Sequence, residues 1–384
     1  MIRADLRSRL SGVAVAFAAA TPLLVGCHGD RGQQAPPIRG VVAGPSQRAM
    51  PLDLHWLVPP AADQDPPLAA PLALDVSPDG RAIYVLELLP PELRVYDAGD
   101  GRFLRRLGRD GEGPGEYRHP RSLAVNRDGV AAVLSMNGRL TLWSGGQDHS
   151  SLRTIQTASG VASEVLAARG DTFVVKTDVF PPADVSEFRR VTPDTALPEP
   201  FFVDDAVPGT EPTSGSFRNH AYAVAATPEG QLLLAPPGPD YLIIRIGSDG
   251  ERLQTIRRPE VPPLRRSAEE IEELRERVRK GFRSMGRPPP AVIPVPEHRS
   301  HIARLAVAPD LTIWALTQRG VEGAAIIDVF SADGEFAASY VVAFSVADLA
   351  LTSDAIFLLA KSTLDVPGIA AAERPDGMPA SVAE

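Results

Sequence analysis

Cysteine is nearly absent from this chain of 384 residues, in which Cys27 is the only one. A single thiol excludes an internal disulfide, so the class of small domains held by disulfides is excluded. Lysine is scarce as well and occurs only three times, so arginine carries nearly all of the positive charge. A long apolar run is also lacking, because the stretch Val13–Val25 is too short to span a membrane stably.

The signatures of nucleophilic hydrolases and of phosphate-binding loops are missing too. No Gly-x-Ser-x-Gly sequence occurs. The glycine-rich segment Gly111–Glu116 has no Gly-Lys-Ser/Thr sequence, and its carboxylates Glu112 and Glu116 would repel a phosphate. A calcium site at these two residues is left open, although they lack the alternating Asp/Asn spacing of a dedicated calcium loop. The segment is interpreted as a tight connector between strands.

The composition favours a large folded domain with an acidic surface. Apolar residues make up 44% of the chain and charged residues 23%, which is typical of a globular protein and excludes global disorder. The formal net charge is −9. An acidic protein is a poor partner for nucleic acid and for anionic lipid, so no nucleic acid is expected as a partner.

The N-terminus carries a targeting signal. Arg3, Arg7 and Arg9 precede the apolar stretch, which ends in Leu-Val-Gly-Cys at Cys27. This order resembles a bacterial lipoprotein signal, in which the cysteine thiol is acylated and the peptide is cut before it. We therefore expect a signal peptide over residues 1–26, a lipidated Cys27, and a flexible tether over 27–49. The expected location is the cell envelope, lipid-anchored at the periplasmic or outer-membrane face, with the bilayer as a partner through Cys27.

Short apolar runs separated by glycine-containing turns recur along the rest of the chain. The inner version of this repeat occurs six times, at Leu74–Val85, Leu123–Leu134, Val165–Val175, Val224–Leu234, Leu305–Leu316 and Leu349–Leu359. An outer version occurs at Leu93–Leu107, Leu140–Ile155, Ile243–Ile256 and Ile326–Tyr340. Asp-Gly turns between apolar runs are typical of β-hairpins, and a spacing of about 40 to 50 residues is typical of one four-stranded propeller blade.

These repeats predict an all-β fold, a six-bladed β-propeller over residues 50–364, followed by a flexible tail over 365–384. Units of this size cannot bury a face alone, so they must stack around an axis and close into a ring. Asp53–Leu57 is additional strand-like sequence, and we expect it to supply the outermost strand of the last blade. The third repeat is the weakest, because the segment Phe180–Pro208 is rich in proline.

One helix interrupts the repeats between the fourth and fifth blades. Ser267 and Glu270 form a capping box, and apolar residues then recur at helical spacing up to Met285 before Gly286. The sequence therefore predicts an amphipathic helical insertion over about 267–286. It is either a brace packed on the propeller or a lid over its axial pocket.

The string GRDGEGPGEYRHP at Gly108–Pro120, lying between two predicted strands, resembles the six-bladed β-propeller lipoproteins related to NHL-repeat proteins. The resemblance covers roughly Leu74–Ala360. It implies the propeller fold and a binding role, without a defined activity.

Three histidines share one position in the repeat. His119, His220 and His301 each lie eight residues before the equivalent turn residue of a different inner hairpin. Equal register predicts similar height around the channel, where three imidazoles can bind zinc and leave a position open for water. This arrangement resembles the peptidyl-hydroxyglycine lyases. The alternative is that the three are ordinary hydrogen-bonded histidines with no cofactor.

Arginines cluster beside those histidines, at Arg118, Arg121, Arg218, Arg299 and Arg304. Guanidinium groups gathered at one channel mouth would favour a small anionic ligand, such as a carboxylate or a sugar acid. The alternative is that they pair with neighbouring acids. Tyr117, Tyr222 and Tyr241 are candidates for stacking on such a ligand.

The sequence thus favours a lipid-anchored cell-envelope module that presents a propeller surface to a ligand or to an envelope protein. The alternative is an enzyme, a metal-dependent lyase or lactone hydrolase that uses the three histidines.

Overall fold

The structure is a computed structural model, and it divides the chain into two units, residues 1–37 and 38–384. It describes residues 42–43, 47–60, 67–144, 149, 151–157, 161–168, 170–179, 185–192, 194, 199–204, 222–284, 286, 288–293, 295–320, 323–362 and 364–375. The predicted signal peptide, Cys27 and most of the tether lie outside these residues. Within them, no helix is long and apolar enough to cross a membrane.

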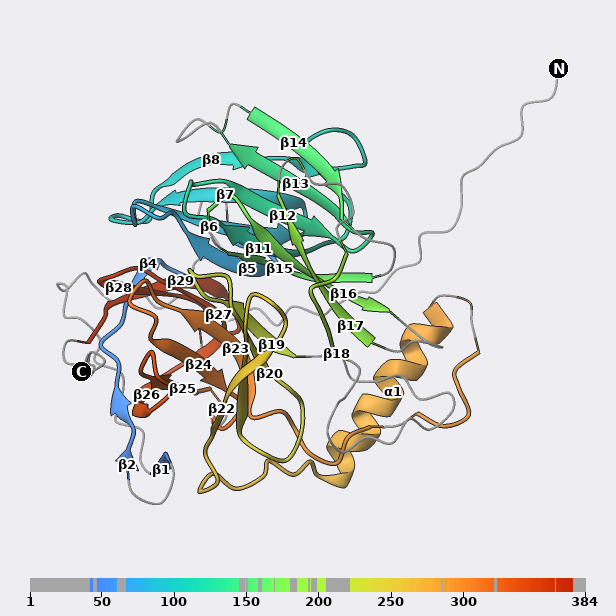
Figure 1. Ribbon diagram of the computed structural model, residues 1–384, viewed down its shortest axis with the longest axis vertical. Helices are drawn as coiled ribbons and strands as arrows, with labels where there is room; N and C mark the ends of the chain where they lie inside the picture. Colours follow the sequence, from blue (N-terminus) through green and yellow to red (C-terminus); the bar gives the residue numbers. More distant parts are fainter. Residues whose placement is uncertain are drawn as a thin grey trace, which may run out of the picture. The chain divides into compact units, whose positions relative to one another are not determined.

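Six small antiparallel sheets arranged in a ring form a six-bladed β-propeller, as the repeats predict (Figure 1). Blade 1 is β5 (Pro71–Val76), β6 (Ala82–Leu88), β7 (Pro91–Asp97) and β8 (Phe103–Leu107). Blade 2 is β11 (Pro120–Val125), β12 (Ala131–Ser135), β13 (Arg139–Ser144) and β14 (Ser151–Gln156). Blade 3 is β15 (Val161–Ala167), β16 (Phe173–Val179), β17 (Val185–Val191) and β18 (Phe202–Asp204). Blade 4 is β19 (Ala223–Ala226), β20 (Leu232–Ala235), β21 (Leu242–Ile246) and β22 (Arg252–Arg257).

The last two blades combine strands from both ends of the described chain. Blade 5 is β23 (Ile302–Val307), β24 (Ile313–Thr317), β25 (Ala325–Phe330) and β26 (Phe336–Val342), with β3 (Met50–Pro51) added parallel to β26. Blade 6 is β27 (Ser345–Leu351), β28 (Ala355–Lys361), β29 (Pro367–Glu373) and β4 (His55–Val58). Two small pairs lie outside the blades, β1 (Val42–Ala43) with β2 (Gln47–Arg48) and β9 (Arg109–Asp110) with β10 (Glu116–Tyr117).

The turns that separate the strands have the chemistry that the sequence predicts. Gly80, Gly129 and Gly250 adopt φ of +69°, +74° and +88°, which only glycine adopts without strain. The connector between blades 1 and 2 is likewise held by glycines, because a β-carbon on Gly108 would lie 2.4 Å from Cε2 of Tyr117. The glycine-rich string is therefore a close approach of backbone to a buried aromatic ring.

The core consists of six apolar clusters, one between each pair of neighbouring blades. Leu86 of blade 1 and Val133 of blade 2 share one cluster, and Phe357 of blade 6 and Ile83 of blade 1 share another. The central strands of the blades, such as β6, β12 and β24, present one face to the preceding blade and the other to the following blade, so their residues are buried on both sides. Each blade is thus stable only between its neighbours.

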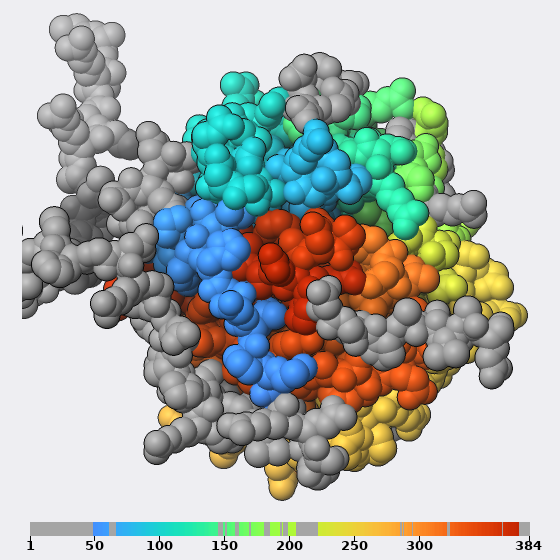
Figure 2. All heavy atoms as spheres, turned by 90° about the vertical axis from the view of Figure 1, so that its left-hand side faces the viewer, coloured from blue at the N-terminus to red at the C-terminus, as the bar shows by residue number. Residues whose placement is uncertain are grey.

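The ring closes inside blade 6, as the sequence predicts. Val58 and Trp56 of β4 pair with Ile369 and Ala370 of β29, so the first long strand of the propeller is the outermost strand of its last blade. Figure 2 shows this closure, with the blue N-terminal strands lying across the red surface of the last blades. The Trp56 ring also stacks on Phe344 at 4.8 Å between ring centroids.

The predicted tail over 365–384 is wrong at its start, because Pro367–Glu373 forms β29. The propeller therefore extends to Glu373 instead of ending at 364. The segment contains Gly368 and three consecutive alanines, so it lacks the bulky alternation of a strand. Small residues are needed there, because a β-carbon on Gly368 would lie 2.7 Å from the carbonyl oxygen of Val58.

The helix between blades 4 and 5 is α1 (Ala268–Ser284), within the predicted insertion. Ser267 and Glu270 form the expected capping box, with Glu270 N donating to Ser267 Oγ at 3.1 Å and Ser267 N donating to Glu270 Oε2 at 2.8 Å. None of its residues is fully buried, so α1 lies at the edge of the propeller (Figure 1).

Candidate functional site: the charged layer of the axial cavity

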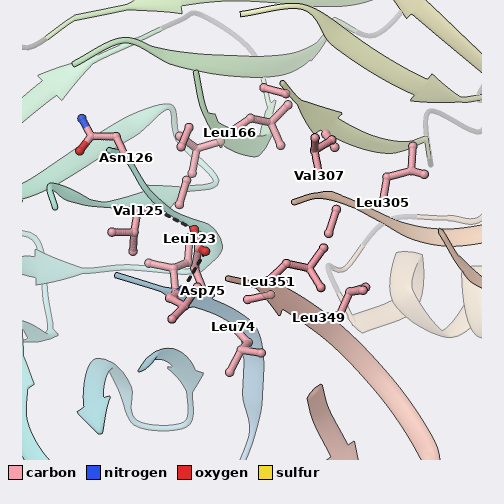
Figure 3. A pocket seen from close by; sticks show the side chains of 18 of the residues that line it. Leu74, Asp75, Leu123, Val125, Asn126, Leu166, Leu305, Val307, Leu349 and Leu351 are labelled. Carbon is pink, nitrogen blue, oxygen red and sulfur yellow. Dashed lines mark hydrogen bonds between the residues drawn. The ribbon is translucent and has the colours of Figure 1, made fainter. Parts of the chain in front are cut away.

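A cavity of about 520 Å³ lies on the propeller axis. It is lined by the first strand of every blade, from β5 through β27. Most of the residues that line it are apolar, including Leu74, Leu166, Val307 and Leu351, and Asp75 is a carboxylate among them (Figure 3). A size of several hundred Å³, with apolar residues and several polar groups in the lining, fits a small-ligand pocket.

Five of the six first strands contain the same irregularity. In five blades the register shifts directly before Ala73, Ser122, Glu164, Arg304 and Asp348, which marks a β-bulge at the same height. These residues are equivalent, because each precedes by four positions the residue whose amide closes the following hairpin turn. Bulges re-aim the side chain that follows them and are common beside functional sites.

Four of the residues at this height are polar, and they come from four blades. We call Ser122, Glu164, Arg304 and Asp348 the charged layer. The corresponding residues of blades 1 and 4, Ala73 and Ala223, are alanines. Glu164, Arg304 and Asp348 line the axial cavity, so the layer places two carboxylates and one guanidinium where a ligand can reach them.

Polar side chains of one blade accept amide hydrogens from the inner strand of the next. Leu74 N donates to Asp348 Oδ2 at 3.0 Å, and Val165 N donates to Ser122 Oγ at 3.1 Å. In blade 1, Asp75 lies two residues after Ala73, and its Oδ2 accepts from Val125 N at 2.6 Å (Figure 3). These bonds provide partners for three backbone amides at the inner edges of the sheets and link neighbouring blades along the axis.

Burial raises the pKa values of all three carboxyl groups in the cavity. The pKa of Asp75 rises to about 7, although amide hydrogens from Val125 and Val76 pull it down. Burial also raises the pKa values of Glu164 and Asp348, against the lowering effect of the Arg304 charge. Arg304 therefore stabilises the ionised forms of both layer carboxylates. Perturbed carboxyl groups in a cavity are a mark of functional sites.

Four of the five arginines predicted to bind an anion are among the described residues, and only Arg304 of these four lines the cavity. Arg118 forms an ion pair with Glu112 at 2.8 Å, and Arg299 forms one with Glu270 of α1. Arg121 donates to Met136 Sδ at 3.0 Å. Arg218 lies outside the described residues. Arg118 and Arg299 thus follow the alternative in which they pair with neighbouring acids, and the ligand-binding prediction now depends on Arg304.

His119 and His301 hold equivalent backbone positions, but their side chains differ. The carbonyls of His119 and His301 accept equivalent hydrogen bonds, from Met136 N at 3.0 Å and Gln318 N at 2.8 Å. His119 is exposed, whereas His301 is buried with Nε2 2.7 Å from the carbonyl oxygen of Pro239. Burial lowers the pKa of His301, which favours its neutral form. His220 lies outside the described residues, and those residues contain no group of three His, Cys, Asp or Glu placed to hold a metal.

The predicted tyrosines lie away from the axial cavity. Tyr117 is fully buried and accepts a hydrogen bond from Trp143 Nε1 at 2.6 Å, so its ring belongs to the core between blades 1 and 2. Tyr241 is buried between blades 4 and 5. Tyr222 donates to Asp204 and faces the ammonium of Lys176 at 5.5 Å. Tyr117 and Tyr241 therefore have no exposed face for stacking on a ligand.

The residues predicted from the sequence include Arg304 of this cavity but not Ser122, Glu164, Asp348 or Asp75. The available signal was a charged or hydroxyl residue inside an otherwise apolar first strand, at the same distance before the turn in several repeats. Aligning the six inner hairpins on their turns would have revealed it.

Comparisons with known proteins support the fold and no more. No protein family and no curated protein matches the chain. Among solved structures, U3-55K is similar with a TM-score of 0.51 at 13% identity, covering 84% of this chain and 98% of that one. A Bacteroides fragilis protein titled "Putative exported protein" has a TM-score of 0.50 at 13% identity, covering 85% and 96%. A gluconolactonase from Xanthomonas campestris has a TM-score of 0.50 at 12% identity, covering 86% and 99%. This chain is thus similar in fold to these three proteins.

Proposed function

We propose that this protein is a lipid-anchored binding module of the bacterial cell envelope that holds a small polar ligand in its axial cavity. The observation that carries the proposal is the charged layer. Three ionisable groups from blades 3, 5 and 6 meet in one cavity, each directly after a bulge that re-aims it. Buried charges are costly for stability alone, so their placement along an accessible cavity favours a binding role.

The envelope location rests on the Leu-Val-Gly-Cys sequence at Cys27. The similarity to the Bacteroides fragilis protein, whose title calls it exported, agrees with it. We expect a fatty-acid probe to label the wild-type protein and not a Cys27→Ser variant, which should accumulate as an unprocessed, unlabelled precursor. Equal labelling of both forms would contradict the anchor.

The binding role is tested by a thermal-shift screen of the full-length protein. The library covers sugars, organic acids, amines, amino acids and dipeptides. We expect at least one class to raise the melting temperature of the wild type and not that of a Glu164→Gln/Arg304→Met variant. If no class does so, the cavity is not a ligand site, and the scaffold role, tested by isolating envelope partners, replaces it.

The second hypothesis is a metal-dependent lyase or lactone hydrolase that uses His119, His220 and His301. Its support is the equivalent backbone placement of His119 and His301. It predicts stoichiometric zinc in the purified protein and its loss in His220→Ala. Elemental analysis without zinc in the wild type would remove this hypothesis.

A further inference from the structure

Arg304 has hydrogen-bonding capacity that the protein leaves unused. Its Nε lies 3.7 Å from Asp348 Oδ1, which is an ion pair beyond hydrogen-bonding distance. Its guanidinium donates no hydrogen bond to the described part of the chain. The side chain is 40% exposed and lines the axial cavity. A guanidinium carries five N–H donors in a planar fork that matches a carboxylate. Arg304 is therefore a free donor group inside the cavity.

The two carboxylates of the charged layer differ in how many of their oxygen atoms accept hydrogen bonds from the described residues. Both oxygens of Asp348 accept backbone amides, from Leu74 N and Leu349 N at 3.0 Å each. Glu164 Oε1 accepts from Ser122 Oγ at 3.0 Å, whereas Oε2 accepts nothing from the residues that the structure describes. Asp348 thus has a structural role at the blade edge. Glu164 Oε2 is the acceptor left for a ligand.

We propose that the charged layer binds a free α-amino acid, with the α-carboxylate on Arg304 and the α-ammonium on Glu164. This inference rests on the proposed function and names the ligand class of the same site. The side chain of the amino acid would lie on the apolar lining, which includes Leu166, Val307 and Leu351 (Figure 3).

A zwitterion fits this layer better than a ligand with one charge. An anion bound to Arg304 alone would lie beside Asp348 and Glu164 and be repelled by both. A cation bound to Glu164 alone would leave the Arg304 donors unused and face its charge. A ligand that carries both charges on neighbouring atoms meets each group with its complement and leaves the net charge of the cavity unchanged.

The test is calorimetric titration of the full-length protein at pH 8 with each of the standard L-amino acids. The strongest binder is then compared with its N-acetyl and carboxamide derivatives. Each derivative removes one charge, so we expect each to bind about ten- to a hundredfold more weakly, as for the loss of one charged hydrogen bond. This comparison uses the wild-type protein and so does not depend on the folding of any variant.

Two variants then assign the two ends of the ligand. Arg304→Met should bind the amino acid and its carboxamide equally weakly, and Glu164→Gln should no longer distinguish the amino acid from its N-acetyl form. Arg109→Met is the matched control. Arg109 is an arginine in an ion pair with Glu116 at 2.8 Å that lies 80% exposed on the surface, and this variant should bind like the wild type.

Each other outcome overturns the inference. If blocking either end leaves binding unchanged, the ligand is not held as a zwitterion. If no amino acid binds while another class of the thermal-shift library does, and Arg304→Met abolishes that binding, the proposed function stands and the amino-acid class is wrong. If no compound binds at all, both fail.

Discussion

At the scale of single residues, glycines hold the glycine-rich connector close to the core. Gly108 and Gly129 have the same φ of +74°, but only Gly108 faces a buried ring, with Tyr117 Cε2 2.4 Å from the position of its β-carbon. Gly108→Ala should therefore lower the free energy of unfolding by about 2–4 kcal/mol, from left-handed strain plus overpacking. Gly129→Ala, with no described atom within 4 Å, should cost only about 1 kcal/mol. Urea unfolding of both variants measures the difference. Equal losses of unfolding free energy would show that the Tyr117 ring moves aside at little cost.

Asp75 gives the protein a pH dependence of its own. Burial raises the pKa of Asp75 from its ordinary value of 3.8 to about 7 in the folded protein, so the folded state holds the proton more tightly than the unfolded chain. The free energy of unfolding should fall as pH rises from about 4 to about 7, by on the order of 4 kcal/mol from this group, and then level off. Asp75→Asn removes this contribution. The difference between wild type and variant, from denaturant unfolding at several pH values, should change across that window, whereas parallel profiles would contradict the assignment.

At the scale of elements, α1 depends on its N-terminal cap because none of its residues is fully buried. Ser267→Ala removes the acceptor for Glu270 N and should cost the helix about 1 kcal/mol, which is about fivefold in its opening equilibrium. Hydrogen exchange of the helix amides should accelerate by that factor. Ser284→Ala, which removes only the bond from Ser284 Oγ to the Gly281 carbonyl at the other end, should leave the first turn unchanged. An equal acceleration there would mean that the cap has no special role.

At the scale of the whole molecule, the ring is held closed by β4. Val58 is 4% exposed in the cluster between blades 6 and 1, and β4 also covers the edge of β29. Deletion of residues 1–60 should lower the melting temperature by about 10 °C and promote aggregation through the bare edge of β29. Deletion of residues 1–49 keeps β4 and should leave the melting temperature within a few degrees. Calorimetry of the two truncated proteins makes the comparison, and equal melting temperatures would show that closure does not depend on β4.

The sequence predicts the six blades, the helical insertion and the closing strand, because each is encoded locally by periodicity and turn residues. The strand Pro367–Glu373 was not predictable in this way, because its pattern is set by contact with β4, which comes more than three hundred residues earlier. The charged layer was not predictable for a related reason. Glu164, Arg304 and Asp348 lie on three different blades, and only ring closure brings them together.

Closure inside blade 6 also has a consequence for how the chain is made. β4 is synthesised before any blade, but its partner β29 is the last strand of the propeller to be made. A growing or prematurely terminated chain therefore keeps an unpaired strand until the end. Only a chain that has been translated through Glu373 can pair β4 with β29, so only such a chain can close the propeller.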